Sequence, residues 1–434
     1  MATDSRMTFA AEANTALRLG VLMLSAGAAS YRVIRSVKRA ARSMGFDRAD
    51  VLVGFNTISC TFHHGDQFQT VVADVPLPGV NSSRIEALET TTHNMLQDYH
   101  TADEINAALD EIEQIPTPRW TLSVAAMSAG LACADFAVLN QFGWVAALLV
   151  FVAAACGQCV RVWLHRKNFN VLGVTTVAAF VSSSIYLIVA TFLGNVSGVP
   201  AAYAPGFIAA VLFLIPGFPL FTAFVDLARF DFTAGIPRFL FALEVIVVIM
   251  LTVTVVAMLA DIPPADGVIN AHSWQYLASG ALASFVAVGC FALLFNSSRR
   301  MALLAATTGL IANVGRLWLI AFEVPGFLAA FMAALFIGVA GSQAGQVGRV
   351  PRVTVTIPAS VVMIPGPTMY RAVLNFANGD TPAALYALTD VTLAVLFIAG
   401  GLIIARLITD PDWAFSRQIN FSKHLDGTAL PINT

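Results

Sequence analysis

Long apolar segments dominate the chain after Arg119. We count about ten of them, each roughly 20 residues long, which is the length that an α-helix needs to cross ~30 Å of hydrocarbon. Charged residues make up only 12% of the 434 residues, against about 25% in soluble domains, so a water-soluble globular fold is excluded. The sequence therefore predicts an all-α polytopic membrane protein with ten transmembrane helices. Their approximate limits are 120–139, 142–161, 170–193, 201–226, 238–260, 271–295, 301–320, 325–346, 353–376 and 383–406.

Residues 1–118 contain no comparable segment and predict a small α/β domain. Its first apolar stretch is interrupted by Glu12 and Arg18, so this stretch predicts neither a signal peptide nor a membrane span. A second helix is expected to follow and to end near Gly45. Residues rich in β-branched and aromatic types predict strands at 51–55, 58–62 and 68–75, the last two joined by a turn at Gly65-Asp66.

Two capping-box patterns predict where the next helices of this domain begin. Ser83 is followed three residues later by Glu86, and Thr101 by Glu104, so each hydroxyl can accept from a free N–H of the first turn. Apolar residues at helical spacing then predict the buried faces, which are Ile85, Leu88, Met95 and Tyr99 in the first helix and Ile105, Leu109 and Ile112 in the second.

Basic residues alternate between the connections of the predicted spans. The connections after the second, fourth, sixth, eighth and tenth spans carry Lys or Arg, whereas the intervening connections carry none. This is the positive-inside pattern, and it predicts that both termini and the α/β domain are cytoplasmic.

A Pro-Gly break occurs twice inside this apolar sequence. Ile215-Pro216-Gly217 recurs as Ile364-Pro365-Gly366, an offset of 364 − 215 = 149 residues, and the same offset places Asp226 on Asn375. Proline removes a helical N–H, and glycine lets the chain leave helical backbone angles. Such a pair predicts two broken helices at a transport site near the membrane midplane.

The two breaks divide the ten spans into two halves of five. Because five is odd, the second half enters the membrane from the opposite face, so the sequence predicts a 5+5 inverted repeat. A second echo supports this division, because Arg161-Val-Trp163 recurs as Arg316-Leu-Trp318. The predicted domains are 1–118 (cytoplasmic α/β), 119–260 and 261–407 (the five-helix repeats) and 408–434 (a cytoplasmic tail).

Several of these features together resemble the threonine/serine exporter family. They are the Gly-containing segment Leu24–Arg32, the ten spans, the motif Leu214–Asp226 and the motif Met363–Arg371. In that family the two halves are fused, as here, or made as two subunits. The resemblance implies export of small hydroxy amino acids, or of succinate-like dicarboxylates for some split members, from the inner membrane of a bacterium.

The residues at the two breaks are the candidate substrate-binding groups. Half-helices that begin near Phe218 and Pro367 would present free N–H groups and a positive dipole end to a carboxylate. Tyr370 and Arg371 lie about one turn further on and could contact the same group. Kinks in packed helices, with Arg371 at the outer interface, are the alternative. The full candidate set is Pro216, Gly217, Phe218, Pro219, Pro365, Gly366, Pro367, Tyr370, Arg371 and Asn375.

Four acids within or at the ends of spans are the candidates for ion coupling, because a carboxyl group in apolar surroundings can take up a proton near neutral pH. Asp226 and Asp390 come first, since one belongs to the repeated motif and the other to the span after the second break. Asp135 and Glu244 follow, with structural pairing as their alternative. For Asp226 the alternative is a cap at the inner surface or a partner for Arg229. Ser182–Ser184 could pack between helices or line the pathway.

The sequence thus predicts a proton-coupled threonine or serine exporter rather than an enzyme. No His, Cys or acid pattern with metal spacing stands out, no cofactor is predicted, and no clustered basic face suggests nucleic acid. The expected partners are a small-molecule substrate, protons, the lipid bilayer and, as an open possibility, a second copy of the chain. A dicarboxylate exporter is the first alternative, and a membrane receptor or enzyme that works through residues 1–118 is the second.

Overall fold

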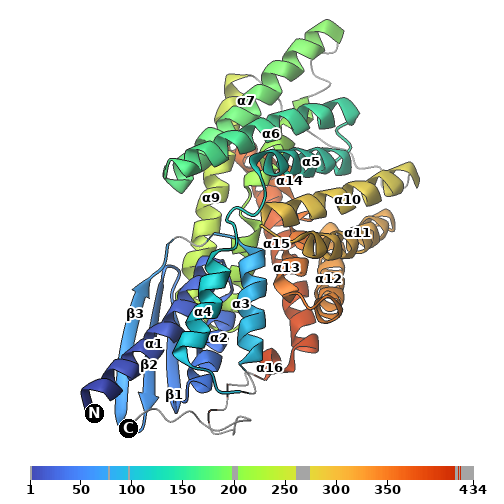
Figure 1. Ribbon diagram of the computed structural model, residues 1–434. Coiled ribbons are helices and arrows are strands. Elements are labelled where there is room, and N and C mark those ends of the chain that lie inside the picture. The colour runs from blue at the N-terminus through green and yellow to red at the C-terminus, as the bar shows by residue number, and fades with distance from the viewer. Residues whose placement is uncertain are drawn as a thin grey trace. The chain divides into compact units, whose positions relative to one another are not determined.

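The computed structural model describes residues 2–76, 79–95, 98–197, 204–260 and 274–415, together with Ile419 and Phe421. The chain is mostly helical, with one small sheet near the N-terminus (Figure 1). It divides into two compact units. The first comprises residues 1–119, 219–240 and 410–434, and the second comprises residues 120–218 and 241–409.

The first unit contains the predicted α/β domain. Helices α1 (Ala2–Ser25) and α2 (Ser30–Ser43) precede strands β1 (Arg48–Val53), β2 (Thr57–His64) and β3 (Gln67–Asp74), and helices α3 (Ser82–Asn94) and α4 (Ala102–Glu113) follow. The three strands form an antiparallel sheet in the order β1-β2-β3, with Val51 opposite Cys60 and Cys60 opposite Val71. The three predicted strands and the turn at Gly65 are therefore confirmed.

The core of this unit lies between the sheet and α1. Ile58, Cys60 and Phe62 alternate along β2 and are fully buried, as expected for a strand with one covered face. Helix α1 packs against β2 and β3 (Figure 1). It comes close because Gly20 lies against Ile58, where a Cβ would meet the Ile58 side chain at 2.5 Å.

One predicted capping box is confirmed and the other is wrong. Thr101 accepts from the Glu104 backbone N–H and Glu104 accepts from that of Thr101, so α4 begins as predicted. Helix α3 begins two residues earlier than expected, because the side chain of Asn81, not that of Ser83, accepts from the Arg84 N–H and serves as the cap. Tyr99 lies beyond the end of α3 and is only half-buried, whereas the other residues predicted for the two faces are buried.

Eight of the described helices are long and apolar enough to cross a membrane, or ten spans if each of two bent pairs counts as one. The chain is an integral membrane protein. The eight are α5 (Leu122–Leu139), α6 (Trp144–Arg166), α7 (Val171–Ser197), α9 (Phe232–Leu259), α10 (Trp274–Leu294), α11 (Arg299–Ala321), α12 (Gly326–Gly348) and α15 (Thr381–Thr409). A short helix, α16 (Pro411–Ala414), follows α15, and most of the predicted tail lies outside the described residues.

The two bent pairs coincide with the two Pro-Gly motifs. The first pair consists of η1 (Ala204–Leu214) and α8 (Gly217–Leu227), and the second of α13 (Arg352–Val361) and α14 (Gly366–Ala377). They bend by 61° and 50° respectively. The first element, η1, is a 3₁₀ helix rather than the expected α-helix. All residues from Phe207 to Ile215 are buried, with α5, α6 and α7 packed against η1.

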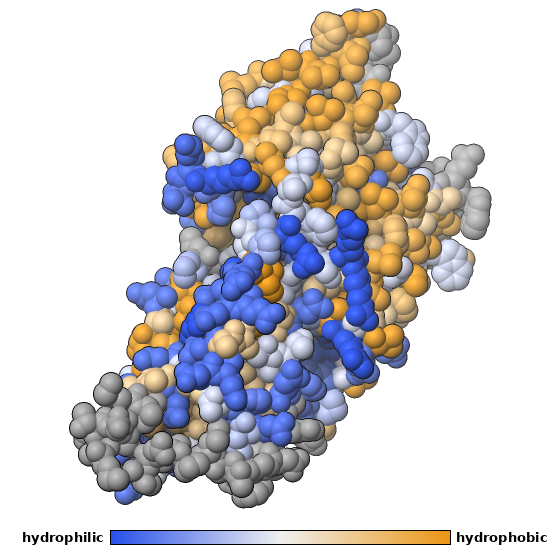
Figure 2. Space-filling model, viewed as in Figure 1, coloured by the Kyte–Doolittle hydropathy of each residue, from blue (hydrophilic) through white to orange (hydrophobic). Residues whose placement is uncertain are grey.

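The surfaces of the two units differ in chemistry. Hydrophobic residues cover most of the visible surface of the membrane helices, and hydrophilic residues gather on the N-terminal elements (Figure 2). Large apolar side chains stand exposed on the membrane helices, among them Trp144, Leu148, Ile188 and Phe192. An exposed apolar surface of this extent fits contact with lipid.

Candidate functional site

The two Pro-Gly breaks pack against each other inside the second unit. A Cβ built on Gly217 would lie 2.6 Å from Cγ2 of Val361, and one built on Gly366 would lie 2.4 Å from Cδ2 of Leu212. Real Cβ contacts are not this short, so glycine is what lets each break approach the helix that leads into the other. The glycines therefore serve a close approach as well as a bend.

These two contacts are reciprocal. The offset between the glycines is 366 − 217 = 149 residues, and the offset between their contact residues, 361 − 212, is also 149. Each contact is therefore the counterpart of the other under the 149-residue offset of the two Pro-Gly motifs. A chance similarity between two apolar segments would not require their three-dimensional contacts to exchange in this way.

Both half-helices begin with the same local geometry. The N–H of Gly217 donates to the carbonyl of Ile215 at 2.8 Å, and that of Gly366 donates to Ile364 at 2.9 Å. Pro365 has φ −81° and ψ 70°, which is the conformation of an inverse γ-turn. Pro219 and Pro367 stand in the first turns, where a missing N–H costs no helical hydrogen bond. As predicted, the half-helices start at the breaks, within one residue of Phe218 and Pro367.

Two predicted substrate-binding residues on α14 have unused hydrogen-bonding capacity. Tyr370 is 2% exposed, and its ring makes an edge contact with Phe207 at a centroid distance of 5.1 Å. Its hydroxyl has no hydrogen-bond partner among the described residues. Arg371 donates through Nη2 to Thr368 at 3.2 Å, while its buried Nε has no partner within the same part of the chain. Asn375, about one turn further, is half-buried.

Three buried polar residues also occur on α6 and α7, the helices that pack against η1. Ser182 lies directly against Gly157, where a Cβ would approach the Ser182 hydroxyl, and the hydroxyl of Tyr186 faces Gly206 in the same way. The Ser182 hydroxyl and Oε1 of Gln158 have no hydrogen-bond partner in the described ranges. The sequence had singled out Ser182 but missed Gln158 and Tyr186.

The missed glutamine had a signal in the sequence. An offset of 313 − 158 = 155 residues places it on Asn313, and 155 is also the offset of the Arg161/Arg316 echo. Asn313 donates to Ser284 at 2.6 Å and accepts from Nε of Arg316 at 2.7 Å. The side chain of Asn313 is therefore hydrogen-bonded on both sides, whereas Gln158 retains an unused acceptor among the described residues.

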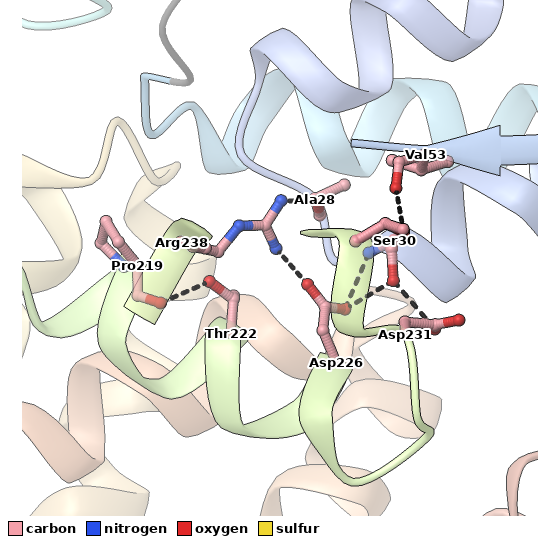
Figure 3. Close-up of polar contacts among 9 residues, drawn as sticks. Ala28, Ser30, Val53, Pro219, Thr222, Asp226, Asp231 and Arg238 are labelled. Atoms are coloured by element: carbon pink, nitrogen blue, oxygen red, sulfur yellow. Dashed lines mark hydrogen bonds and ion pairs between the residues drawn. The ribbon is translucent and has the colours of Figure 1, made fainter. Parts of the chain in front are cut away.

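Asp226 is the most tightly held of the four candidate acids (Figure 3). Its side chain is fully buried, and Oδ2 accepts from Nη1 of Arg238 at 2.6 Å. Oδ1 accepts from both the backbone N–H and the hydroxyl of Ser30, each at 2.9 Å. The partner is thus Arg238 rather than Arg229, which lies over the ring of Tyr31.

The other three acids lie apart from Asp226 and from one another along the chain. Asp135 is half-buried in α5, and one of its carboxylate oxygens is buried without a hydrogen-bond partner within the described residues. Its electrostatic neighbours are the thiols of Cys133 and Cys290, the latter on α10, which packs against α5. Glu244 on α9 and Asp390 on α15 are exposed.

Comparison with known proteins identifies the family to which the chain belongs. A family model described as "Putative threonine/serine exporter" matches residues 14–260, more than half of the chain. A second, "Threonine/Serine exporter, ThrE", matches residues 280–408. The two models together cover the N-terminal elements and both halves of the membrane region.

Curated relatives agree with these models. A threonine/serine exporter from Corynebacterium glutamicum is 23% identical over 94% of this chain and 86% of its own length. A protein named as a probable threonine/serine exporter from Mycobacterium tuberculosis is 24% identical over 91% of this chain and 76% of its own length. The Escherichia coli protein named as probable succinate transporter subunit YjjP is 27% identical over 52% of this chain and 86% of its own length. No solved structure matches the chain. The chain belongs to the threonine/serine exporter family.

Proposed function

We propose that this protein is a secondary active exporter of threonine, serine or similar small amino acids, working by alternating access around the two breaks. The observation that carries the proposal is the reciprocal packing of Gly217 on Val361 and of Gly366 on Leu212. Two equivalent halves in contact at their breaks can exchange conformations, which opens a central site to either face in turn.

The order of elements supports the 5+5 inverted repeat within this proposal. Each half runs through three long helices, a bent pair and a final long helix, as α5 to α9 and then α10 to α15. With five spans in each half, the second half would run in the opposite direction across the membrane. We place both termini on the cytoplasmic side of a bacterial inner membrane, from the alternation of basic connections.

The polar groups around the breaks fit a small zwitterion with a hydroxyl. The two half-helix starts offer positive dipole ends to its carboxylate, whereas the N–H groups of Gly217 and Gly366 are already used in the local turns. The unpartnered groups of Tyr370, Ser182 and Gln158 offer one neutral hydrogen-bonding group each. The exporters from Corynebacterium and Mycobacterium, matched over most of this chain, support the same substrate class.

For proton coupling we place Asp135 first among the four acids. It has an unpartnered buried oxygen and thiols as its electrostatic neighbours, so its charge has no counter-ion among the described residues. A carboxyl group in such surroundings can bind and release a proton during transport. Asp226 is neutralised by Arg238, and Glu244 and Asp390 face outward.

The test is efflux of labelled threonine from proteoliposomes under an imposed proton gradient. We expect Asp135→Asn to lower gradient-driven efflux at least tenfold. The rate of threonine exchange measured without a gradient should stay unchanged. Asp390→Asn and Glu244→Gln, measured in parallel, should keep both activities. If Asp135→Asn still couples threonine efflux to protons, Asp135 is not the coupling group.

A dicarboxylate is the second candidate substrate, and Arg371 is the observation that favours it. Its partly unpartnered guanidinium lies on α14, five residues from Gly366, and could bind a second carboxylate. The name of the Escherichia coli relative points the same way. Competition in the efflux assay decides, because excess succinate should leave threonine efflux unchanged if the amino acid is the substrate.

A further inference from the structure

We infer that Ser30, Asp226 and Arg238 are positioning residues for transport, which lock the α8–α9 turn onto the α1–α2 loop. The N-terminal domain and the distal part of the first broken helix would then move as one body, with Pro216–Gly217 as the hinge. This inference rests on the proposed transport function and adds a role for the N-terminal domain.

The lock consists of contacts that join distant parts of the sequence (Figure 3). Asp226, at the end of α8, accepts two hydrogen bonds from Ser30, which is 196 residues away. Arg238, in the first part of α9, bridges back to the same loop, because its second nitrogen, Nη2, donates to the carbonyl of Ala28 at 3.2 Å. The side chains of Asp226 and Arg238 are 0% and 2% exposed, so water does not compete for these bonds.

Asp226 also supplies what α2 lacks. The residue before this helix is Ala29, which has no side chain to cap it, and the first turn contains no acidic residue. The free N–H of Ser30 is instead satisfied by the Asp226 carboxylate, at the end of the helix where negative charge is favoured. The start of α2 is therefore completed only when the α8–α9 turn is in place.

Further contacts surround this network and restrain the same turn. Oδ2 of Asp231 also lies 2.9 Å from the Ser30 hydroxyl and shares its single proton with Asp226, and Thr233 donates to the carbonyl of Val53, at the end of β1. The guanidinium of Arg229 lies 5.7 Å from the ring centre of Tyr31. The turn is thus attached both to the α1–α2 loop and to the sheet.

The division of the chain into compact units agrees with these contacts. The first unit takes in residues 219–240 together with the N-terminal domain. This segment begins two residues beyond Gly217, where the backbone bends by 61° between η1 and α8, and it ends inside α9. A Pro-Gly bend at the edge of a compact unit is where a hinge is expected, because the residues there can absorb a change in backbone angles.

The two breaks share their local geometry, but the equivalent residues Asp226 and Asn375 are bonded differently. The position equivalent to Asp226 in the second break is Asn375, which is half-buried and forms no side-chain hydrogen bond with the described residues. The first half-helix is therefore held by the N-terminal domain at Asp226, whereas Asn375 of the second half-helix makes no equivalent bond among the described residues. Through this asymmetry the N-terminal domain would act on transport through the first broken helix alone.

The test uses the full-length protein in proteoliposomes with Ser30→Ala, Asp226→Asn and Arg238→Gln. We expect each variant to lower the maximal rate of threonine efflux at least fivefold, with KM changed less than twofold, because the substrate groups are untouched. Hydrogen exchange should rise together in segments 25–31 and 226–238. Asp226→Glu should recover part of the rate, and Asp74→Asn, which alters an exposed acid at the end of β3, should match the unmodified protein.

The outcomes separate this inference from the transport proposal. If the unmodified protein does not export threonine, the transport proposal fails, whereas the hydrogen-exchange result still tests the lock. If Asp226→Asn alone loses efflux while Ser30→Ala and Arg238→Gln behave normally, Asp226 acts by itself and the lock is refuted. Unchanged exchange in both segments for all three variants would also refute it. Ser30→Ala keeps the backbone bond to Asp226, so it remains informative if the charge variants do not fold.

Discussion

At the scale of single residues, the most informative groups are buried polar atoms with unused hydrogen bonds. A buried polar group without a partner costs about 1–3 kcal/mol, so a chain retains one where something else can satisfy it. On α14 and on the helices that pack against η1, these groups are the Tyr370 hydroxyl, the Ser182 hydroxyl and Oε1 of Gln158. The first prediction concerns the hydroxyl of Tyr370.

Tyr370→Phe keeps the ring contact with Phe207 and removes only the hydroxyl. If that hydroxyl binds substrate, the loss of one neutral hydrogen bond of about 0.5–1.5 kcal/mol should raise KM for threonine by roughly two- to tenfold, with the maximal rate largely retained. Concentration-dependent efflux measures this directly. Tyr386→Phe is the matched control because Tyr386 is exposed on α15, and an equal KM change in both variants would remove Tyr370 from the site.

Glu12 gives a pH prediction for the N-terminal unit. Burial in α1 raises the pKa of this carboxyl, and nearby His64 partly opposes the rise. Because the folded state binds the proton more tightly than the unfolded chain, the ionised form destabilises folding as pH rises through the folded pKa. Glu12→Gln should therefore raise Tm at pH 8 and have little effect near pH 4. Thermal unfolding measures this, with the exposed Glu111→Gln as control, and a gain that is the same at both pH values would contradict it.

At the scale of elements, the two bent pairs depend on one close contact each. A side chain larger than hydrogen at Gly366 must displace Leu212, and overpacking of this kind typically costs about 1–3 kcal/mol. Shortening the opposing side chain should relieve the overlap, because it restores the space that a larger residue at the glycine position needs.

Gly366→Ala should accordingly lower Tm and efflux, and Gly366→Ala with Leu212→Ala should regain part of both. By reciprocity, Gly217→Ala should be relieved by Val361→Ala. Gly400→Ala in α15 is the control, since nothing lies within 4 Å of a Cβ at that position. Additive losses in the double variants, instead of relief, would show that the breaks do not pack as described.

At the scale of the whole molecule, the proposal states which side of the membrane each region of the chain faces. The alternating basic connections predict that the N-terminal domain is in the cytoplasm and that the connection between α14 and α15 is outside. Both regions contain exposed residues at which a label can be introduced, such as Asp74 at the end of β3 and Asn378 after α14.

A membrane-impermeant maleimide added to intact cells should therefore label Asn378→Cys and not Asp74→Cys. Permeabilised cells should label both, because each position is exposed. The unmodified chain, with its five native cysteines, provides the background. The reverse pattern in intact cells would invert the proposed orientation.

The sequence by itself determined the spans, the two breaks, the three strands and the start of α4. These features depend on local properties: apolar length, the backbone limits of proline and glycine, alternation along a strand, and a capping pair three residues apart. It also determined the offset of 149 residues, but not that the contacts of the two breaks exchange under it.

Only the tertiary structure decided which groups meet across the chain. The cap of α3 is Asn81 rather than Ser83, because the loop before the helix sets where the first turn begins. The partner of Asp226 is Arg238, twelve residues away, and its hydrogen-bond donor is Ser30, 196 residues away. Pairings of this kind follow from how helices and loops pack in space, which periodicity and spacing do not encode. The repeated Pro-Gly motif could therefore be identified from the sequence. The contacts among Ser30, Asp226 and Arg238 at the end of its first copy were evident only in the fold.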